Sequence, residues 1–403
     1  MRHSRPRLFS ALTAAVLGLG AFGAAASPAA EEPRVRAREL GVAPGIFAPG
    51  NHNAITDVAG VRVGQVTLVE GDSVRTGVTA ILPHAGNTYR SRVPAAVHVG
   101  NGYGKFVGLS QVNELGELET PIVLTCTLCV WKAADAVAGW MLAKPDMGNV
   151  RSLNVVVGET NDGGLNDIRA RPVTATAVVQ ALETAASGPV AEGSVGAGTG
   201  TELFAWKGGI GTASRRLPDS LGGWTIGALV QGNYGGVLQV AGAPVGQALG
   251  QYAFQNAVAA RGTGKGPADD SGDGSIIIVI ATDAPLSDRN LGRLASRGMM
   301  ALGRTGSSAS NGSGDYILAF STNESVRRAF DTPRHTTTEL ANESMSAVFQ
   351  AGVDAVEEAI YNALFMATTV SGNGQTVEAI PLDKVRGVLR AHGIGASADA
   401  AAQ

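Results

Sequence analysis

The sequence predicts an α+β fold in which packed β-sheets are flanked by helices. Predicted strands and helices are segregated along the chain rather than strictly alternating, and this order favours such layers. Glycine, with 55 of the 403 residues, is about twice as frequent as usual and indicates many tight turns and close backbone approaches. Hydrophobic residues make up 44% and charged residues 16% of the chain, which is typical of a well-buried globular protein.

The N-terminus has the pattern of a signal peptide. Arginines at positions 2, 5 and 7 precede an apolar stretch over 8–23, and alanines 24–26 supply a small-residue cleavage site. A membrane anchor is the competing interpretation, but this Ala- and Gly-rich stretch is marginal as a membrane span. We therefore expect a signal peptide over 1–26, a mobile leader over 27–44 and one domain over 45–403, in a periplasmic or secreted protein.

The next part of the chain is predicted to contain short strands joined by tight turns. Apolar segments punctuated by glycine predict strands over 61–69, 78–82, 95–99, 122–127 and 154–158. Apolar residues near helical spacing predict a helix over 132–142, and a second helix is expected over 175–185.

A glycine-rich stretch over 192–216 separates these elements from the rest. Its Gly196-Ala-Gly198-Thr-Gly200 run resembles a nucleotide-binding fingerprint, but the third glycine comes one position early and no buried strand precedes it. Nucleotide binding is therefore not predicted. The formal charge of −3 likewise provides no electrostatic reason to bind nucleic acid or anionic membranes.

Strands and helices follow a clearer order after this stretch. Strands are expected over 224–230, 236–241, 276–282 and 316–321. Ser287 is a natural N-cap for a helix over 288–302. The apolar stripe over 338–365 predicts a long helix.

The two cysteines, Cys126 and Cys129, form a C-x-x-C spacing inside an apolar run. A redox motif would need an exposed helix N-terminus that lowers the pKa of one thiol. Here the cysteines are expected to be small hydrophobic residues of a buried strand. Zinc is not expected, because no second pair of Cys or His completes four ligands. Whether the two form a disulfide stays open.

Ser275 stands between a polar, glycine-rich run over 262–274 and a strongly apolar strand. Cleavage of the Gly274–Ser275 bond would leave Ser275 with both a hydroxyl and a free α-amine. A nucleophile paired with a nearby base is what amide hydrolysis needs.

Ser313 and Asp315 precede the strand at 316–321 as Ser275 precedes its own. If the two strands are parallel neighbours, these residues lie at the same end of the sheet, and positions two apart face the same way. The Asp315 carboxylate could then orient the amine of Ser275. Residue types alone favour an ordinary solvated turn here.

Two further polar residues end predicted strands. The side-chain amide of Asn233 could donate to a developing oxyanion, although Asn is also a common turn residue. Glu159 could pair with a substrate ammonium group or be an ordinary surface acid. The residue type alone favours the structural role in both cases, a turn residue for Asn233 and a surface acid for Glu159.

Other hydrolase classes are weakly supported. A Ser-His-Asp triad would need a histidine in a recognisable motif, and no G-x-S-x-G elbow is present. A metallohydrolase would need clustered metal ligands such as H-E-x-x-H. The scattered histidines beyond the N-terminal segment are His52, His84, His98, His335 and His392.

A series of ordered motifs runs from about residue 45 to residue 381. The N-terminal ones are Asn53-Ala-Ile-Thr-Asp-Val-Ala-Gly-Val-Arg-Val-Gly64, Asn101-Gly-Tyr-Gly104, Glu119-Thr-Pro-Ile122, Val157-Gly-Glu-Thr-Asn-Asp162, Glu192-Gly-Ser-Val-Gly-Ala-Gly-Thr-Gly200 and Lys207-Gly-Gly-Ile-Gly211. The C-terminal ones are Gly274-Ser-Ile-Ile-Ile-Val279, Ala281-Thr-Asp-Ala-Pro-Leu286 and Asn311-Gly-Ser-Gly-Asp315. Together they resemble the DmpA/BapA family, the L-aminopeptidase/D-esterase and β-peptidyl aminopeptidase group of self-processing serine peptidases.

The resemblance implies an αββα four-layer sandwich, similar in layout but not in connectivity to N-terminal-nucleophile hydrolases. It implies self-cleavage at Gly274–Ser275 into chains 27–274 and 275–403, and assembly into a homo-oligomer of such αβ heterodimers. No cofactor or metal is expected. The substrates implied are short peptides, amides or esters that lose their N-terminal residue through an acyl-enzyme.

The resemblance also suggests residue roles. Ser275 corresponds to the nucleophile and its freed amine to the base, with Ser313 and Asp315 in supporting positions. Asn233 matches the oxyanion-stabilising Asn, and Glu159 matches an acid that holds the amino group of the substrate in some members.

Departures from the family pattern leave the substrate range open. Position 315 is Asp where some members have Glu, and Cys126 and Cys129 replace residues that are usually Asn and Ser or similar. Asp273–Gly274 is a bond that can rearrange chemically, so a nick there would not be self-processing. An amine-accepting acyltransferase on a related self-processing fold and a non-catalytic periplasmic binding protein are the alternative functions.

Overall fold

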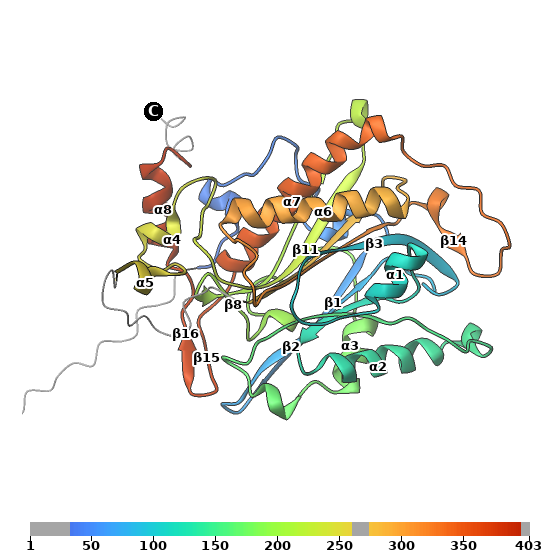
Figure 1. Cartoon of the computed structure of the whole chain (residues 1–403), viewed down its shortest axis with the longest axis horizontal. Helices are drawn as coiled ribbons and strands as arrows, with labels where there is room; N and C mark the ends of the chain where they lie inside the picture. The colour runs from blue at the N-terminus through green and yellow to red at the C-terminus, as the bar shows by residue number, and fades with distance from the viewer. Residues whose placement is uncertain (1–32, 260–273, 396–403) are drawn as a thin grey trace, which may run out of the picture. The chain divides into compact units, whose positions relative to one another are not determined.

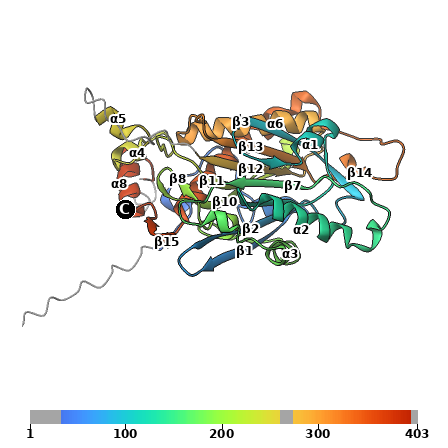
Figure 2. The same ribbon diagram turned by 60° about the horizontal axis from the view of Figure 1, so that its bottom comes forward.

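Two main β-sheets lie face to face in the computed structural model, which describes residues 33–259 and 274–395 (Figures 1 and 2). Apolar side chains from both inner faces form one buried cluster, which includes Leu124, Ile277 and Leu318. Helices cover both outer faces, so the layers follow the order helix, sheet, sheet, helix. The predicted α+β class and αββα sandwich are confirmed.

The first sheet has the strand order β1-β2-β6-β7-β4. Its neighbours pair antiparallel except β6 and β7, which are parallel. Helices α2 and α3 pack against its outer face through buried Val, Ala, Leu and Met side chains. The bounds are β1 Arg62–Glu70, β2 Val74–Leu82, β6 Ile122–Cys126, β7 Val156–Thr160, β4 Phe106–Val107, α2 Val130–Leu142 and α3 Ala175–Glu183.

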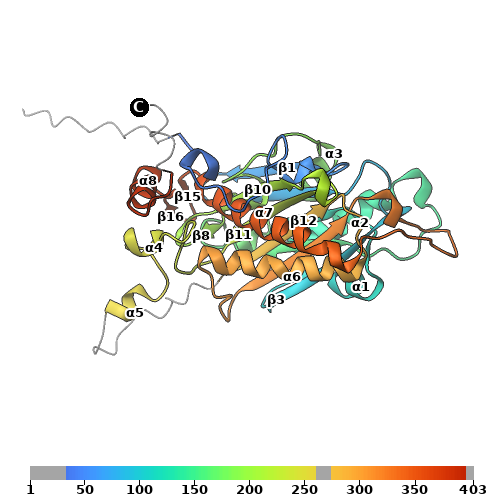
Figure 3. The same ribbon diagram turned by 90° about the horizontal axis from the view of Figure 1, so that it is seen from above.

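The second sheet has the order β10-β11-β12-β13-β3-β14, with β5 also paired to β3. Strands β12 and β13 are parallel, whereas the other neighbours are antiparallel. Figure 3 shows α6 and α7 side by side over the outer face of this sheet. The bounds are β10 Gly209–Arg216, β11 Thr225–Asn233, β12 Ser275–Thr282, β13 Gly314–Ser321, β3 Ser91–Gly102, β14 Arg328–Ala329, β5 Glu117–Leu118, α6 Asp288–Thr305 and α7 Met345–Phe365.

Smaller elements lie outside these layers. Two hairpins form from β8 with β9 and from β15 with β16. The bounds are β8 Glu202–Leu203, β9 Trp206–Lys207, β15 Val370–Gly372, β16 Gln375–Val377, α1 Leu109–Leu115, α4 Val245–Ala248, α5 Gln255–Ala259 and α8 Leu382–Ala391. Among the described residues, no helix is both long and apolar enough to cross a membrane.

Strand β10 was not predicted, because its sequence looks like part of a glycine-rich loop. Its glycines instead allow close packing of backbone against backbone. A Cβ on Gly211 would lie 1.9 Å from the carbonyl oxygen of Ala359 in α7, and one on Gly209 would lie 2.0 Å from that of Gly193. Glycine therefore permits α7 to pack directly on the sheet.

Two predicted elements are wrong in extent or kind. Residues 236–241 form no strand, since the backbone N–H groups of Val237 and Gln239 donate to the last carbonyls of α6, Gly306 and Thr305, at 2.9 Å each. The long helix begins at Met345 instead of position 338. Most residues between 330 and 344 are exposed and offer no continuous apolar face for a helix to bury.

Residues 34–44 belong to the folded domain, so the predicted mobile leader over 27–44 is wrong for this part. Ala37, Leu40 and Val42 are buried, and Ala37–Leu40 forms a 3-10 helix. The Arg34 side chain donates to the carbonyl oxygens of Phe365 and Ile380. The predicted signal peptide over 1–26 and the rest of the leader, 27–32, lie outside the described residues.

A buried ion pair fastens α7 to β10. The Nη2 atom of Arg215 lies 2.6 Å from Oε2 of Glu358, and both side chains are fully buried. The guanidinium of Arg38 contacts both oxygens of Glu358, with Nε 2.9 Å from Oε1 and Nη2 2.9 Å from Oε2. One carboxylate thus connects the N-terminal segment, a strand and a helix.

Replacement of Glu358 by Gln should destabilise the fold by about 3–5 kcal/mol, because it leaves the Arg215 charge buried without a counter-ion. Urea unfolding measures this loss. The matched control is Glu324→Gln, since Glu324 is 90% exposed and 3.8 Å from Arg327, and its stability should equal that of the parent. Equal stability of the two variants would contradict the role assigned to the pair.

Candidate active site

Three strand ends meet at Ser275. It is the first residue of β12 and is paired antiparallel with Asn233, the last residue of β11, and parallel with Gly314, the first residue of β13. The predicted parallel pairing of the two strands is therefore present. Ser275 is only 8% exposed, and its hydroxyl donates to the carbonyl oxygen of Gly274 at 2.7 Å.

Small residues on both sides make room for this arrangement. A Cβ on Gly314 would lie 2.0 Å from the carbonyl oxygen of Tyr103 and 3.3 Å from Oγ of Ser275. A Cβ on Gly274 would lie 2.1 Å from the carbonyl oxygen of Asn233. A larger residue at either position would displace the strand ends around the Ser275 hydroxyl.

The side chains of Ser313 and Asp315 point toward each other, as their spacing of two residues on an extended chain predicts. The Ser313 hydroxyl donates to Oδ1 of Asp315 at 2.6 Å, and both residues are 1% exposed. Oδ2 of Asp315 is buried and accepts no hydrogen bond from the described residues. Burial raises the pKa of Asp315 above its usual value, and the hydrogen bond from Ser313 opposes this rise. The pair forms a buried acid with one unused oxygen, rather than a solvated turn.

The side-chain amide of Asn233 is held from both ends. Its Oδ1 accepts from the backbone N–H of Glu202 at 2.9 Å, and its Nδ2 donates to the carbonyl oxygen of Asn161 at 3.0 Å. The Glu202 donor requires Oδ1 at that position, so the orientation of the amide is defined. An amide nitrogen carries two hydrogens, which leaves one N–H for a ligand.

Lys207 anchors the hairpin that supplies this contact, and the sequence interpretation missed it. It is fully buried and pairs with Glu202 across β8 and β9. Its Nζ donates to the carbonyl oxygens of Gly198, Thr201 and Gly208 at 3.0, 2.8 and 2.7 Å. Burial lowers the pKa of Lys207 to about 7, but three carbonyl acceptors favour the ammonium form, because a neutral amine has only two N–H groups.

Glu159 lies in β7 at the facing end of the first sheet and is 4% exposed. Its Oε1 accepts from the backbone N–H of Lys105 at 2.9 Å and lies 3.2 Å from Nζ of the same lysine. Gly104 is needed for this approach, because a Cβ there would lie 2.8 Å from Oε1. Glu159 is therefore a buried, paired carboxylate and not a surface acid. Lys105 was not identified from the sequence, since no motif marked it.

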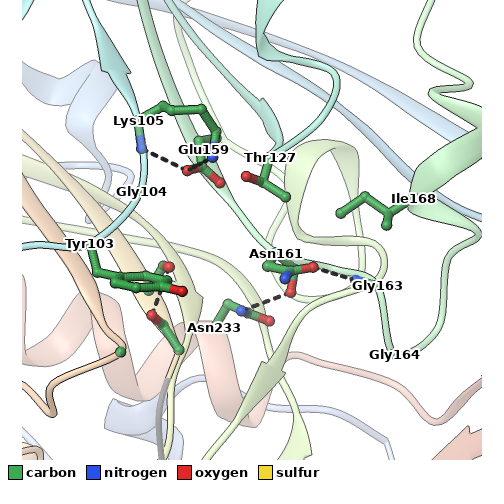
Figure 4. A pocket seen from close by; sticks show the side chains of 13 residues that line it. Tyr103, Gly104, Lys105, Thr127, Glu159, Asn161, Gly163, Gly164, Ile168 and Asn233 are labelled. Atoms are coloured by element: carbon green, nitrogen blue, oxygen red, sulfur yellow. Dashed lines mark hydrogen bonds and ion pairs between the residues drawn. The ribbon is translucent and has the colours of Figure 1, made fainter.

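These residues line one cavity of about 640 Å³ between the ends of the two sheets (Figure 4). Figure 4 places Lys105 and Glu159 together and Asn233 beside Asn161. Ser313 and Asp315 are not among the residues that line it. The lining residues are Tyr103, Gly104, Lys105, Thr127, Glu159, Asn161, Gly163, Gly164, Ile168, Asn233, Gly274, Ser275 and Gly312.

A disulfide joins Cys126 and Cys129, which answers the question left open by the sequence. Both are buried as expected, and Cys126 is the last residue of the strand β6, but Cys129 is the N-cap of α2, so the prediction that it belongs to a strand is wrong. The bond closes a short loop whose Thr127 lines the cavity. The disulfide thus belongs to the wall of the candidate site.

The rival hydrolase sites receive no geometric support from the described residues. None of the five histidines considered for a triad lines the cavity that contains Ser275. Within the described ranges, no group of three or more His, Cys, Asp or Glu side chains is placed to hold a metal ion.

Comparisons with known proteins agree with the family resemblance. The model of peptidase family S58 matches residues 53–377. The β-peptidyl aminopeptidase BapA of Sphingosinicella microcystinivorans is 42% identical over 95% of this chain and 96% of its own length.

Solved structures of similar proteins have the same fold. A β-aminopeptidase from a Burkholderia species is 42% identical, with a TM-score of 0.79 over 90% of this chain and 99% of its own. An L-aminopeptidase D-Ala-esterase/amidase from Ochrobactrum anthropi is 39% identical, with a TM-score of 0.79 over 89% of this chain and 99% of its own. It is described as a prototype of the serine aminopeptidases and a variant of the Ntn hydrolase fold. The chain therefore belongs to peptidase family S58.

Proposed function

We propose that this protein is a self-processing serine aminopeptidase, which releases N-terminal residues from short peptides, amides or esters through an acyl-enzyme on Ser275. The observation that carries the proposal is the meeting of Ser275, Asn233 and Glu159 in one cavity. A nucleophile, a hydrogen-bond donor and a carboxylate for an amine then lie around one bound substrate. The family match and the names of the relatives support the same reaction class.

Maturation would begin at the Gly274–Ser275 bond. The Ser275 hydroxyl already contacts the Gly274 carbonyl group. Its oxygen attacks the carbonyl carbon, the hydroxyl proton moves to the nitrogen, the C–N bond breaks, and the acyl group is left on oxygen as an ester. Water then hydrolyses the ester, which leaves the Gly274 carboxylate on chain 27–274 and a free amine on chain 275–403.

Turnover would repeat this chemistry on a substrate. The neutral amine of Ser275 accepts the proton of its own hydroxyl as Oγ attacks the scissile carbonyl. The free N–H of Asn233 donates to the developing oxyanion. The proton then passes to the leaving amine, and water hydrolyses the acyl-enzyme. The buried Ser313–Asp315 pair stabilises the protonated amine through its negative charge.

The localisation and assembly are part of the proposal. The basic and apolar pattern of residues 1–26 supports export to the periplasm or beyond. The family likeness supports a homo-oligomer of αβ heterodimers. Neither a cofactor nor a metal takes part in the proposed reaction.

The first prediction from the proposed function concerns maturation. Mass spectrometry with N-terminal sequencing should find a chain that begins at Ser275 and a second that ends at Gly274. Ser275→Ala should stay intact and inactive, because it lacks the attacking oxygen. The matched control, Ser220→Ala, removes an exposed serine outside the cavity and should mature normally. An intact parent chain, or a new terminus at Gly274 instead, would contradict the mechanism.

The second prediction concerns Asn233. Loss of one oxyanion donor typically lowers kcat by about 10²–10³-fold, so Asn233→Ala should reduce kcat by that order with a smaller change in KM. Steady-state kinetics on the matured fraction, quantified by mass spectrometry, measures this effect. A change confined to KM would show that Asn233 binds the ground state only.

The third prediction concerns the pH profile. Protonation of Asp315 removes its charge, and burial places this step above the usual pKa of Asp. Ser313→Ala removes the hydrogen bond that lowers this pKa, so the acid step that Asp315 contributes to kcat/KM should move to higher pH. Protonation of the Ser275 amine adds a second acid step to the profile, so a profile in which neither acid step moves to higher pH would refute the role of Asp315.

A further inference from the structure

Among the described residues that line the cavity, Lys105 and Glu159 are the two charged ones. The proposed reaction uses Glu159 to hold the substrate amine but gives Lys105 no task. Lys105 is 32% exposed, whereas its partner Glu159 is 4% exposed. Lys105 is thus a partly exposed cation in the substrate cavity, and stabilisation of the fold alone does not explain its position.

The two oxygens of Glu159 are used differently. Oε1 accepts from the backbone N–H of Lys105 and pairs with its ammonium group. Oε2 has no hydrogen bond to any residue in the described ranges. A substrate ammonium can therefore bind Oε2 while Lys105 keeps its place on Oε1.

The charge balance of the cavity then becomes unfavourable when the bound substrate has an ammonium group but no carboxylate. Lys105 and Glu159 neutralise each other, so an incoming ammonium on Oε2 of Glu159 adds a second positive charge beside Nζ of Lys105. Like charges that are close together and partly removed from water repel strongly. A carboxylate on the substrate would remove this excess charge by pairing with Lys105.

The geometry also defines which residue of the substrate carries that carboxylate. Because Lys105 and the substrate ammonium would share one carboxylate group, a partner for Lys105 must lie within a few atoms of the ammonium. The scissile carbonyl lies at Ser275, and the leaving group extends beyond it. The carboxylate must therefore be on the same residue as the amine.

We propose that Lys105 makes the cavity select substrates whose N-terminal residue carries a carboxylate beside its amine. Such residues are N-terminal Asp or Glu, and Asp linked through its side-chain carbonyl. The inference rests on the proposed aminopeptidase function and narrows its substrate class. Nζ of Lys105 has three N–H donors, so it can pair with this carboxylate and with Glu159 together.

The test uses matched pairs of p-nitroanilides that differ in one charge. One pair is α-linked Asp against Asn, and the other is β-linked Asp against the same compound with its free carboxylate as the amide. A ratio of kcat/KM of about tenfold or more in favour of the acid is expected for the parent enzyme, since tenfold corresponds to a modest ion-pair contribution. The pair with the larger ratio identifies the linkage that fits better.

Variants connect the preference to Lys105. Lys105→Gln should reverse the ratio to below one, because Glu159 then repels the substrate carboxylate, while kcat/KM for the neutral substrates rises. Lys105→Arg should keep a ratio above one. The matched control is Lys384→Gln, since Lys384 is an exposed residue of α8 outside the cavity, and its ratio should equal that of the parent.

A parent ratio of one or less, or a ratio that Lys105→Gln leaves unchanged, would overturn the inference. In both cases, turnover of the neutral amides by a chain that begins at Ser275 would leave the proposed function standing. Absence of turnover on every amide by a correctly matured chain would instead show that the proposed function has failed.

Discussion

The register of β12 between β11 and β13 is the constraint on which the site depends. The pairing of Ser275 with Asn233 on one side and Gly314 on the other brings the nucleophile, the amide donor and the Ser313–Asp315 pair to one end of the sheet. A shift by one residue would turn every side chain of these strands to the opposite face. Both faces of β12 are apolar, since Ile277 and Val279 bury toward the first sheet while Ile276, Ile278 and Ile280 bury under the helices. The close backbone contacts of Gly274 and Gly314, which leave no room for a Cβ, therefore hold the register at the strand ends.

The cavity exists because the second sheet supplies the reacting groups and the first sheet supplies Glu159, while Lys105 lies in the loop between β3 and β4. Glycines permit both halves, since Gly104 lets Glu159 approach the backbone and Gly314 leaves room for the Ser275 hydroxyl. Behind the cavity, Lys207 holds the hairpin that orients Asn233 with three carbonyl contacts. Buried charges thus support the site, while the cavity itself exposes one ion pair.

The sequence predicts the parts of this structure that have a local signal. The apolar strand after Ser275 and the matching strand after Asp315 are such signals, and together they place the candidate nucleophile and its acid. The roles of Asn233 and Glu159 came from the family resemblance, because a strand-end Asn or Glu alone is usually a turn or surface residue. Lys105 lies outside the family motifs, and Lys207 begins one of them but was given no role, since only the contacts with Glu159 and with three carbonyls show what each does. Strand β10 was not predicted because its glycines resemble those of a turn or loop, whereas in the structure they allow α7 to pack closely on the sheet.

The central claim is that Ser275 carries the acyl group after it has become a chain terminus. The most direct measurement is to trap the acyl-enzyme by rapid acid quench during turnover and to map the adduct by mass spectrometry. The account predicts an added mass of one N-terminal residue on the peptide that begins at Ser275, and its removal by hydroxylamine, as for an ester. An adduct on another residue, or an acylated Ser275 within an uncut chain, would contradict it.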